Sequence, residues 1–520
     1  MDNYLKASRV GLIVVGVSSL FLSACTTVGP DFEKPQPEVA PEWLQAENEQ
    51  ISTDPATYRD WWKNFNDPVL DQLIDRAYQN NLTLQIAGLR VYEARAILGV
   101  ATGAKYPQIQ QMVSSAGGTR LSTNAEPISN LPDPIRDGVD NTFGNYRVGF
   151  DAAWEMDFWG KYRRIDESAG ANYLAKIATY DDVLVTITAE VASAYILLRT
   201  LEERLSIAEN NVALQQRSLQ ISSVRNRNQL TTELDPALAR SLLSTTEALV
   251  PVLRATIRDI KNALSMLLGE SPGDIDDLLA QSSGIPTPPM EASLGVPSDL
   301  LRRRPDIRRA EYRAASQSAR IGVAKADLYP ALSLVGNVGM ASGDVGDLFE
   351  SDSFRAFGFL SFRWNIFNYG RIKNLVRAED ARFQQSIVNY HNTVLRSLME
   401  VEGASNRFIE AQAEAEALAG GVEASGRAVE LAEIQYREGT ATYTRVLESQ
   451  RFQLLTQDSH ANARGRIGTN FVAMYKALGG GWDNETNQQD FVPREMIETM
   501  QQRVNWGDML ESGTPPSENN

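Results

Sequence analysis

The stretch Ile321–Pro330 reads IGVAKADLYP and the stretch Leu98–Pro107 reads LGVATGAKYP, so five of ten positions are identical. The two stretches are offset by 223 in residue number (321 − 98). Downstream, WEMDFWG (Trp154–Gly160) is similar to WNIFNYG (Trp364–Gly370) at an offset of 210 (364 − 154), and this offset persists almost to the end of each copy. These matches predict that the fold is a duplicated unit. Two copies are too few to form a solenoid.

The offset falls by 13 between the two matches (223 − 210), which predicts an insertion in the first copy, within the polar stretch Ser122–Asn141. The predicted organisation is a signal peptide (1–24), a lipidated N-terminal segment (25–60), a first repeat (61–281) with a barrel hairpin at about 108–158, a linker (282–299), a second repeat (300–480) with a barrel hairpin at about 331–367, and a C-terminal equatorial segment and tail (481–520).

Each hairpin contains a strand with one apolar and one polar face. Alternate residues are apolar from Tyr146 to Phe158 and from Phe354 to Ile366. The polar positions between them include Arg147, Asp151, Glu155, Asp157, Arg355, Arg363 and Asn365. Period two indicates strands, and a strand of a soluble sandwich alternates in the same way. The long aromatic side and the acids opposite favour a membrane β-barrel with a wet lumen.

The two hairpins supply four strands, which cannot close into a barrel on their own. Open sheet edges are not tolerated in lipid, and single-chain barrels begin at about eight strands. Several chains are therefore expected to contribute, and three chains would give 3 × 4 = 12 strands.

The segments after the hairpins are expected to be very long helices. Apolar residues recur every seven positions from Ile177 to Leu219 and from Ile387 to Val429, and no proline occurs between Gly160 and Pro236. This heptad pattern is typical of coiled coils. Residues 161–225 as one helix would span roughly 100 Å, which does not fit a compact globule. We interpret these apolar residues as structural packing and predict a fold that is α+β but mainly α.

The N-terminus has the layout of an export signal. Lys6 and Arg9 precede an apolar run, Val10–Ala24, that is shorter than the about 20 residues needed to span a bilayer. The end of the run, LSAC, resembles a bacterial lipobox, which predicts acylation of Cys25, the only cysteine. The alternative is a signal that ends elsewhere and leaves Cys25 as a spare thiol. Thr26 follows in place of the aspartate that retains such lipoproteins at the inner membrane, which favours the outer membrane.

Composition argues against two classes of function. The net charge of −16 is unfavourable for nucleic acid, because phosphate binding needs a basic face. The two histidines, His391 and His460, fall in helical runs, and neither a GxxxxGK(S/T) nor an HExxH motif occurs. We therefore expect no enzymatic activity, no cofactor and no metal site.

Several motifs together resemble one family. LLRRRPDIRRAE (Leu300–Glu311), ARIGVAKADLYPALSL (Ala319–Leu334), CTTVGPDFEKP (Cys25–Pro35) and WWKNFNDPVLDQLIDRAYQNN (Trp61–Asn81) are similar to segments of TolC-like outer-membrane efflux lipoproteins of the NodT-like branch. The resemblance covers essentially the whole mature chain. It implies a homotrimer with a 12-stranded outer-membrane barrel, a long α-helical periplasmic tunnel and an equatorial belt that includes about Asp483–Val504. It also implies two partners, a periplasmic adaptor and an inner-membrane pump of the resistance-nodulation-division type.

The resemblance also implies a gate at the helix tips, Arg225–Pro236 and Tyr436–Arg451. By the family pattern, Tyr436 should hydrogen-bond Asp235, and Glu448 should supply a constricting ring in the trimer. Further residues implied for the gate and its turns are Thr444, Arg445, Arg451, Gln229 and Gly439. Gln229 departs from the usual glycine, Glu448 from the usual aspartate, and Arg445 from the usual acid or apolar residue. The alternative is that these are ordinary exposed charges at helix ends.

Three interpretations of the function remain at this stage. The favoured one is the outer-membrane channel of a tripartite efflux system that passively conducts small toxic compounds or drugs. A channel of the same fold for type I protein secretion is the nearest alternative. A non-conducting coiled-coil scaffold lipoprotein is the third, although a scaffold needs no charged lumen residues such as Asp151 and Glu155.

Overall fold

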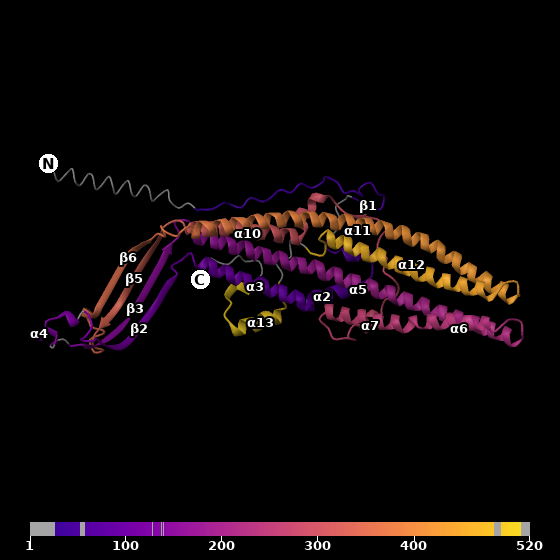
Figure 1. Cartoon of the computed structure of the whole chain (residues 1–520), viewed down its shortest axis with the longest axis horizontal. Coiled ribbons are helices and arrows are strands. Elements are labelled where there is room, and N and C mark those ends of the chain that lie inside the picture. The colour runs from indigo at the N-terminus through magenta and orange to yellow at the C-terminus, as the bar shows by residue number, and fades with distance from the viewer. Residues whose placement is uncertain are drawn as a thin grey trace.

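The computed structural model describes residues 27–52, 58–126, 128–136, 138, 140–482 and 490–510. The molecule is elongated, with a β-sheet at one end and long helices that extend from it to the opposite end (Figure 1). The helices are α2 (Pro68–Asn80), α3 (Leu82–Gly103), α4 (Asp133–Arg136), α5 (Lys161–Arg227), α6 (Leu234–Glu247), α7 (Leu249–Leu267), α8 (Asp276–Leu279), α9 (Leu300–Arg303), α10 (Pro305–Ala326), α11 (Arg371–Arg437), α12 (Tyr443–Ala477) and α13 (Arg494–Arg503). The strands are β1 (Ile51–Ser52), β2 (Ile109–Arg120), β3 (Thr142–Met156), β4 (Ala292–Ser293), β5 (Ala331–Ser342) and β6 (Phe354–Arg363). Single 3₁₀ turns lie at Trp61–Phe65, Ile128–Asn130, Pro297–Asp299, Ser351–Ser353 and Gly507–Leu510.

The helices of the two copies correspond. α3 and α10 both contain 22 residues, and their first residues differ in number by 223 (305 − 82). α5 and α11 both contain 67 residues, and their first residues differ in number by 210 (371 − 161). These are the two offsets found in the sequence, so the predicted duplication and both long helices are confirmed. The predicted insertion coincides with the loop between β2 and β3 (121–141), which contains α4.

The copies differ where the chain returns from the tips. α12 is a single helix, whereas its counterpart is divided into α6 and α7 at Ala248. Pro251 lies three residues beyond this break. Proline donates no hydrogen bond and its ring clashes with the carbonyl of residue i−4, which here is Glu247, the last residue of α6.

The four long strands form one antiparallel sheet in the order β2-β3-β5-β6. One face carries Tyr146, Val148, Trp154, Leu334, Leu360 and Phe362, and the other carries Arg147, Asp151, Glu155, Asn337, Arg355 and Arg363. Within the described residues, β2 and β6 each pair on one side only, so the sheet is open at both edges. The predicted pair of hairpins with an apolar and a polar face is therefore present.

Two details of the strands differ from the prediction. β6 ends at Arg363, so Asn365 and Ile366 lie beyond it. β3 ends at Met156, so Asp157 is not a strand residue. Its carboxylate oxygens instead accept the backbone N–H groups of Tyr162 (3.0 Å) and Arg163 (2.9 Å) at the start of α5. Asp157 thus satisfies donors that an α-helix leaves free in its first turn.

The sheet joins the helices through paired aromatic residues and two glycines. Trp159 stacks on Tyr329 with ring centroids 4.6 Å apart, and its Nε1 donates to the carbonyl of Pro330 at 2.8 Å. Gly160 (φ 75°) and Gly370 (φ 80°) precede α5 and α11 in a left-handed conformation. Only glycine adopts this conformation without strain, which explains why both copies end their strand motif in glycine.

The main hydrophobic core lies about midway along the helices. Trp61 stacks on Tyr475 at 5.7 Å, and Phe471 packs between Phe65 and Phe408. α5 contains an apolar stretch long enough to cross a membrane, but 67% of that stretch is buried among other helices. Its hydrophobicity therefore reflects packing within the protein.

An N-terminal strap (27–52) runs along the outside of the helices (Figure 1). It begins beside the sheet, where the N–H of Val28 donates to the carbonyl of Trp159 at 3.0 Å. It then crosses α10 at Gly322, where an added Cβ would lie 2.7 Å from the Val28 oxygen. The strap ends in β1, which pairs with β4 in the segment between the two repeats. It therefore connects the base of the sheet to the middle of the molecule.

The described C-terminal residues (490–510) lie against α3 and α5. Phe491 makes edge-to-face contacts with Tyr92 and Tyr180, and Arg95 donates to the carbonyl of Met509 at 2.9 Å. The equatorial role of this segment stays a prediction. Residues 483–489 of the predicted segment lie outside the described residues.

Candidate functional site

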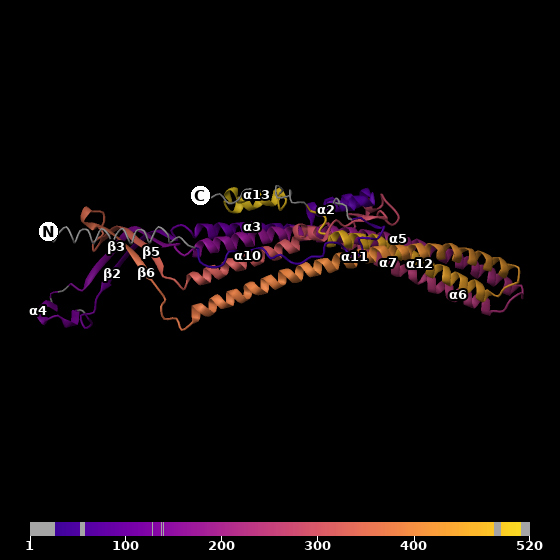
Figure 2. The same ribbon diagram turned by 90° about the horizontal axis from the view of Figure 1, so that it is seen from above.

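The site predicted from the sequence lies at the end of the molecule farthest from the sheet. There the turn between α5 and α6 and the turn between α11 and α12 lie side by side (Figure 2). A small hydrophobic cluster holds the two hairpins together and consists of Ala239, Ala432, Tyr436, Tyr443 and Val446.

The two turns have equivalent backbone geometry. Gly439 has φ 77°, and Gln229, its counterpart in the first copy, has φ 60°. A left-handed conformation costs a non-glycine residue roughly 1–2 kcal/mol. A side-chain hydrogen bond supports the first turn in this conformation: Asn226 Nδ2 donates to the carbonyl of Thr231 at 3.1 Å.

Tyr436 links the two hairpins. Its hydroxyl donates to Asp235 Oδ2 at 2.9 Å, across 201 residues of sequence, and the same oxygen accepts a short hydrogen bond from Thr231 Oγ1. Tyr436 is only 4% exposed. Burial, together with the hydrogen bond to the Asp235 carboxylate, raises the pKa of Tyr436 to about 12. The hydroxyl therefore remains a donor at physiological pH.

Arg225 covers the ring of Tyr436. Its guanidinium carbon lies 4.8 Å from the ring centroid, and Nη1 donates to the carbonyl of Arg437 at 2.7 Å. On the other side, Tyr443 packs edge-to-face at 5.3 Å and shares a 3.3 Å hydrogen bond with Ser218. Tyr436 is thus fixed by contacts from α5, α6 and α12.

The other predicted tip residues point away from this cluster. Thr444, Glu448 and Arg451 are spaced by four and three residues, so they share one face of α12, and all are exposed. Arg445 is also exposed, and its Nη1 donates to Gln435 Oε1 at 3.4 Å. The structure therefore joins Asp235 and Tyr436 directly and leaves Thr444, Glu448 and Arg451 on an open surface.

The polar face of the sheet is a second region of interest. Arg147 donates to Asp151 Oδ1 at 2.6 Å, and Asn337 makes a short hydrogen bond to the same oxygen from the next strand. Glu155 lies 3.9 Å from Arg363. These charges face one another along the face opposite to the aromatic one, as expected for a wet lumen.

Neither region contains catalytic machinery. Among the described residues, no group of three His, Cys, Asp or Glu side chains could hold a metal ion. What the arrangement offers is mechanical and electrostatic: a sheet with a polar face, a long helical body, and hairpin tips held together by one buried hydrogen bond.

The chain is similar to known proteins over nearly its full length. The model of the outer membrane efflux protein family matches residues 73–270 and 296–480. The pyoverdine export outer membrane protein OpmQ of Pseudomonas putida is 30% identical over 476 residues, which cover 90% of this chain and 97% of OpmQ. The toluene efflux pump outer membrane protein TtgF of Pseudomonas putida is 29% identical, with 90% and 97% covered. The solved outer-membrane channel OprN superposes with a TM-score of 0.79 at 31% identity, covering 88% of this chain and 99% of OprN.

The fold and the two regions define one protomer of an outer-membrane channel, in which four strands per chain enter a trimeric barrel that continues into an α-helical tunnel. The chain belongs to the outer membrane efflux protein family. The predicted family, fold class and outer-membrane location are thereby confirmed. The prediction that the chain is not an enzyme is confirmed as well, because the family consists of efflux channels.

Sequence reasoning gave no individual role to three of the residues around Tyr436, although two of them, Arg225 and Tyr443, lie within the predicted tips. Arg225 could have been suspected because it lies in the last turn of α5, where the negative end of the helix dipole stabilises a cation. Tyr443 and Ser218 carried no such signal, because they meet only when the two hairpins dock across 225 residues. Cys25 lies outside the described residues.

Proposed function

We propose that three copies of this chain form the outer-membrane channel of a tripartite efflux system. The channel would conduct small toxic compounds passively, from a resistance-nodulation-division pump and its periplasmic adaptor to the outside. The observation that carries the trimer is the open sheet. Its edges at β2 and β6 bear unpaired backbone groups that lipid cannot satisfy, so neighbouring chains must cover them.

The efflux role is supported by the relatives. Their names describe pyoverdine export and toluene efflux, and each match covers 90% of this chain. A passive channel agrees with the two regions described above, which offer a polar lumen and hairpin tips.

We further propose that the tips form a gate that is closed in this conformation. Tyr436 and Asp235 would hold the α5–α6 hairpin against the α11–α12 hairpin in each chain. Glu448 would contribute an acidic ring in the trimer, with Thr444 nearer the tip and Arg451 behind it. Arg445, also exposed on α12, would offset part of the negative charge of that ring.

Acylation of Cys25 is a third proposal, and the position of the strap supports it. Thr27 packs against Gly160, at the point where β3 gives way to α5. The first described residue of the strap is therefore held at the junction between sheet and helices. Acyl chains on Cys25 would anchor the chain in the inner leaflet of the outer membrane.

The decisive experiment combines stoichiometry with transport. Native mass spectrometry in detergent should show a trimer, and deletion of the gene should sensitise cells to hydrophobic toxicants, with recovery on complementation. A stable monomer that inserts and conducts would contradict the trimer. Loss of a secreted protein from the medium, with unchanged toxicant sensitivity, would instead favour the secretion channel.

A further inference from the structure

The polar face of the sheet contains a row of apolar side chains. The register aligns Ile109 with Ala153, Ala153 with Val335, and Val335 with Phe359, so one apolar row crosses all four strands. The neighbouring row aligns Gln111, Asp151 and Asn337 with Phe357. Two phenylalanines therefore share the face of Asp151, Glu155 and Arg363 rather than the lipid-facing side.

The two phenylalanines form an open aromatic patch. The rings of Phe357 and Phe359 lie nearly parallel, with centroids 6.0 Å apart and planes inclined by 17°. Phe357 is 43% exposed and Phe359 is 52% exposed. The guanidinium carbon of Arg355, two residues before Phe357 on the same face, lies 5.7 Å from the Phe357 ring centroid.

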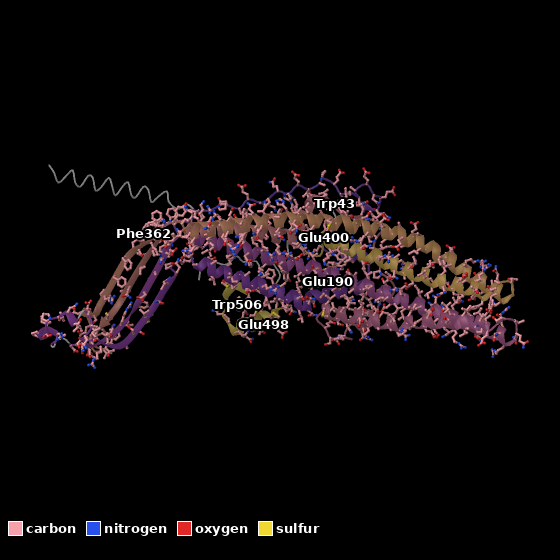
Figure 3. All side chains as sticks on the ribbon, viewed as in Figure 1. Trp43, Glu190, Phe362, Glu400, Glu498 and Trp506 are labelled. Carbon is pink, nitrogen blue, oxygen red and sulfur yellow. The ribbon has the colours of Figure 1, made fainter. Side chains whose placement is uncertain are left out.

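Neither lipid contact nor packing within the chain accounts for this patch. The aromatic residues of β6 that face lipid are Phe354 and Phe362, on the opposite side of the strand; Phe362 lies at the end of the sheet nearest the helices (Figure 3). Placing large apolar side chains in water is unfavourable, and exposed apolar patches commonly mark binding surfaces. The flat, nearly parallel rings of Phe357 and Phe359 offer an aromatic molecule a surface for offset stacking.

The charges around the patch select the ligand. Asp151 is neutralised by Arg147 and by a hydrogen bond from Asn337. Glu155 lies within 4.0 Å of both Lys161 and Arg363. Among the described residues, Arg355 makes no ion pair and is exposed beside the rings. The charge left over beside the aromatic patch is therefore positive.

We propose that Phe357, Phe359 and Arg355 form a contact site in the barrel lumen for planar aromatic carboxylates. The inference rests on the proposed function, because it takes this face to line the path of the exported compound. The rings stack on the aromatic body of the ligand, and Arg355 binds its carboxylate. In the trimer the site occurs three times, so a departing molecule meets the same surface on each chain.

The test uses the full-length trimer and one defined probe, 2-naphthoate. The probe is added from the side of the loops 121–141 and 343–353, so that it reaches the barrel whatever the state of the tips. Single-channel recording measures the concentration that halves the ion current, and saturation-transfer NMR on the trimer in nanodiscs measures binding without requiring conduction. Cyclohexanecarboxylate, with equal charge but no aromatic ring, should block about tenfold more weakly.

The variants separate the aromatic and the charged contribution. Phe357→Ser combined with Phe359→Ser should raise the half-blocking concentration of 2-naphthoate about tenfold. Arg355→Gln should weaken blockade by 2-naphthoate but leave blockade by neutral 2-naphthol unchanged. The matched control, Phe354→Leu with Phe362→Leu on the lipid-facing side of the same strand, should leave blockade within about twofold of wild type.

Each outcome decides one question. Equal blockade of the serine variant and the wild type overturns the site, as does equal blockade by the aromatic and the aliphatic acid. Where the double variant with serine does not assemble, Phe357→Leu combined with Phe359→Leu replaces it, and unchanged binding in that variant overturns the site as well. A trimer that binds the probe in the NMR measurement but carries no current even when Tyr436→Phe and Asp235→Ala release the tips contradicts the proposed channel function instead.

Discussion

Replacement of Tyr436 by Phe tests the proposed gate at a single atom. The substitution removes the hydroxyl that donates to Asp235 at 2.9 Å but keeps the ring, and with it the contacts to Arg225 and Tyr443. A hydrogen bond to a charged group contributes about 1.5–3 kcal/mol. Thr231 continues to donate to the Asp235 carboxylate, so that carboxylate keeps a partner and the lower value applies.

The effect multiplies in a trimer. If the three chains open together, about 1.5 kcal/mol per chain amounts to about 4.5 kcal/mol, which is a factor of about 10³ in the ratio of closed to open channels. Single-channel recording of the purified trimer should show a large gain in open probability, and cells that lack the pump should become sensitive to vancomycin. Tyr436→Phe combined with Asp235→Ala should have at least the same effect on open probability.

The matched control is Tyr390→Phe. Tyr390 is also fully buried on α11, but among the described residues its hydroxyl has no hydrogen-bond partner. Removing that hydroxyl should leave gating at wild-type values. If the single variant at Tyr436 and its combination with Asp235→Ala both behave like wild type while the trimer forms normally, the closure lies elsewhere and the gate assignment is wrong.

Three further predictions concern the anchor, the topology and the core. Cys25→Ala should abolish incorporation of radiolabelled palmitate, and absence of lipid on the wild-type protein would refute the anchor. Epitope tags in the loops 121–141 and 343–353 should be reached by antibody on intact cells; access only after permeabilisation would reverse the topology. Burial raises the pKa of Asp181 to about 7, against the lowering effect of Arg308. The stabilisation by its protonated form is full below about pH 4 and is lost as the pH rises through 7. Asp181→Asn should therefore raise the thermal midpoint at pH 8 more than at pH 5, and an equal shift at both pH values would contradict this interpretation.

The sequence predicted the parts of the fold that depend on local periodicity. The two offsets between the sequence repeats are also those between the paired helices, because the duplication preserved the length of each helix. Period-two alternation located the strands, since the two faces of a sheet meet different solvents. The hydrogen bond between Tyr436 and Asp235 could be expected only through the family resemblance, because nothing local relates two residues 201 positions apart.

The alternation that located β6 also concealed its aromatic patch. Phe354 and Phe362 fit an apolar face, and Arg355 and Arg363 fit a polar one, but Phe357 and Phe359 occupy polar-face positions. When the residues are sorted only into an apolar and a polar face, two phenylalanines at polar-face positions are overlooked. The register with β5 places Phe357 beside Asn337, on the same face as Arg355 and Arg363.

The arginine-rich motif LLRRRPDIRRAE shows why a recognisable signature can still hide its physical role. Arg304 is 7% exposed, and its guanidinium donates to the carbonyl of Ala477 at 2.7 Å, to Asp306 at 2.7 Å and to Glu400 at 2.8 Å. It thereby caps the C-terminal end of α12, where free carbonyls favour a cation, and ties it to the start of α10 and to α11. Glu400 lies near mid-length along the helices in Figure 3, between the sheet and the tips. A buried guanidinium tolerates the loss of a partner poorly, so any movement that opens the tips must leave this junction intact. The bending that frees Tyr436 is therefore expected in the segments of α11 and α12 between this junction and the tips. The sheet, and the helical segments between the sheet and this junction, are expected to stay fixed.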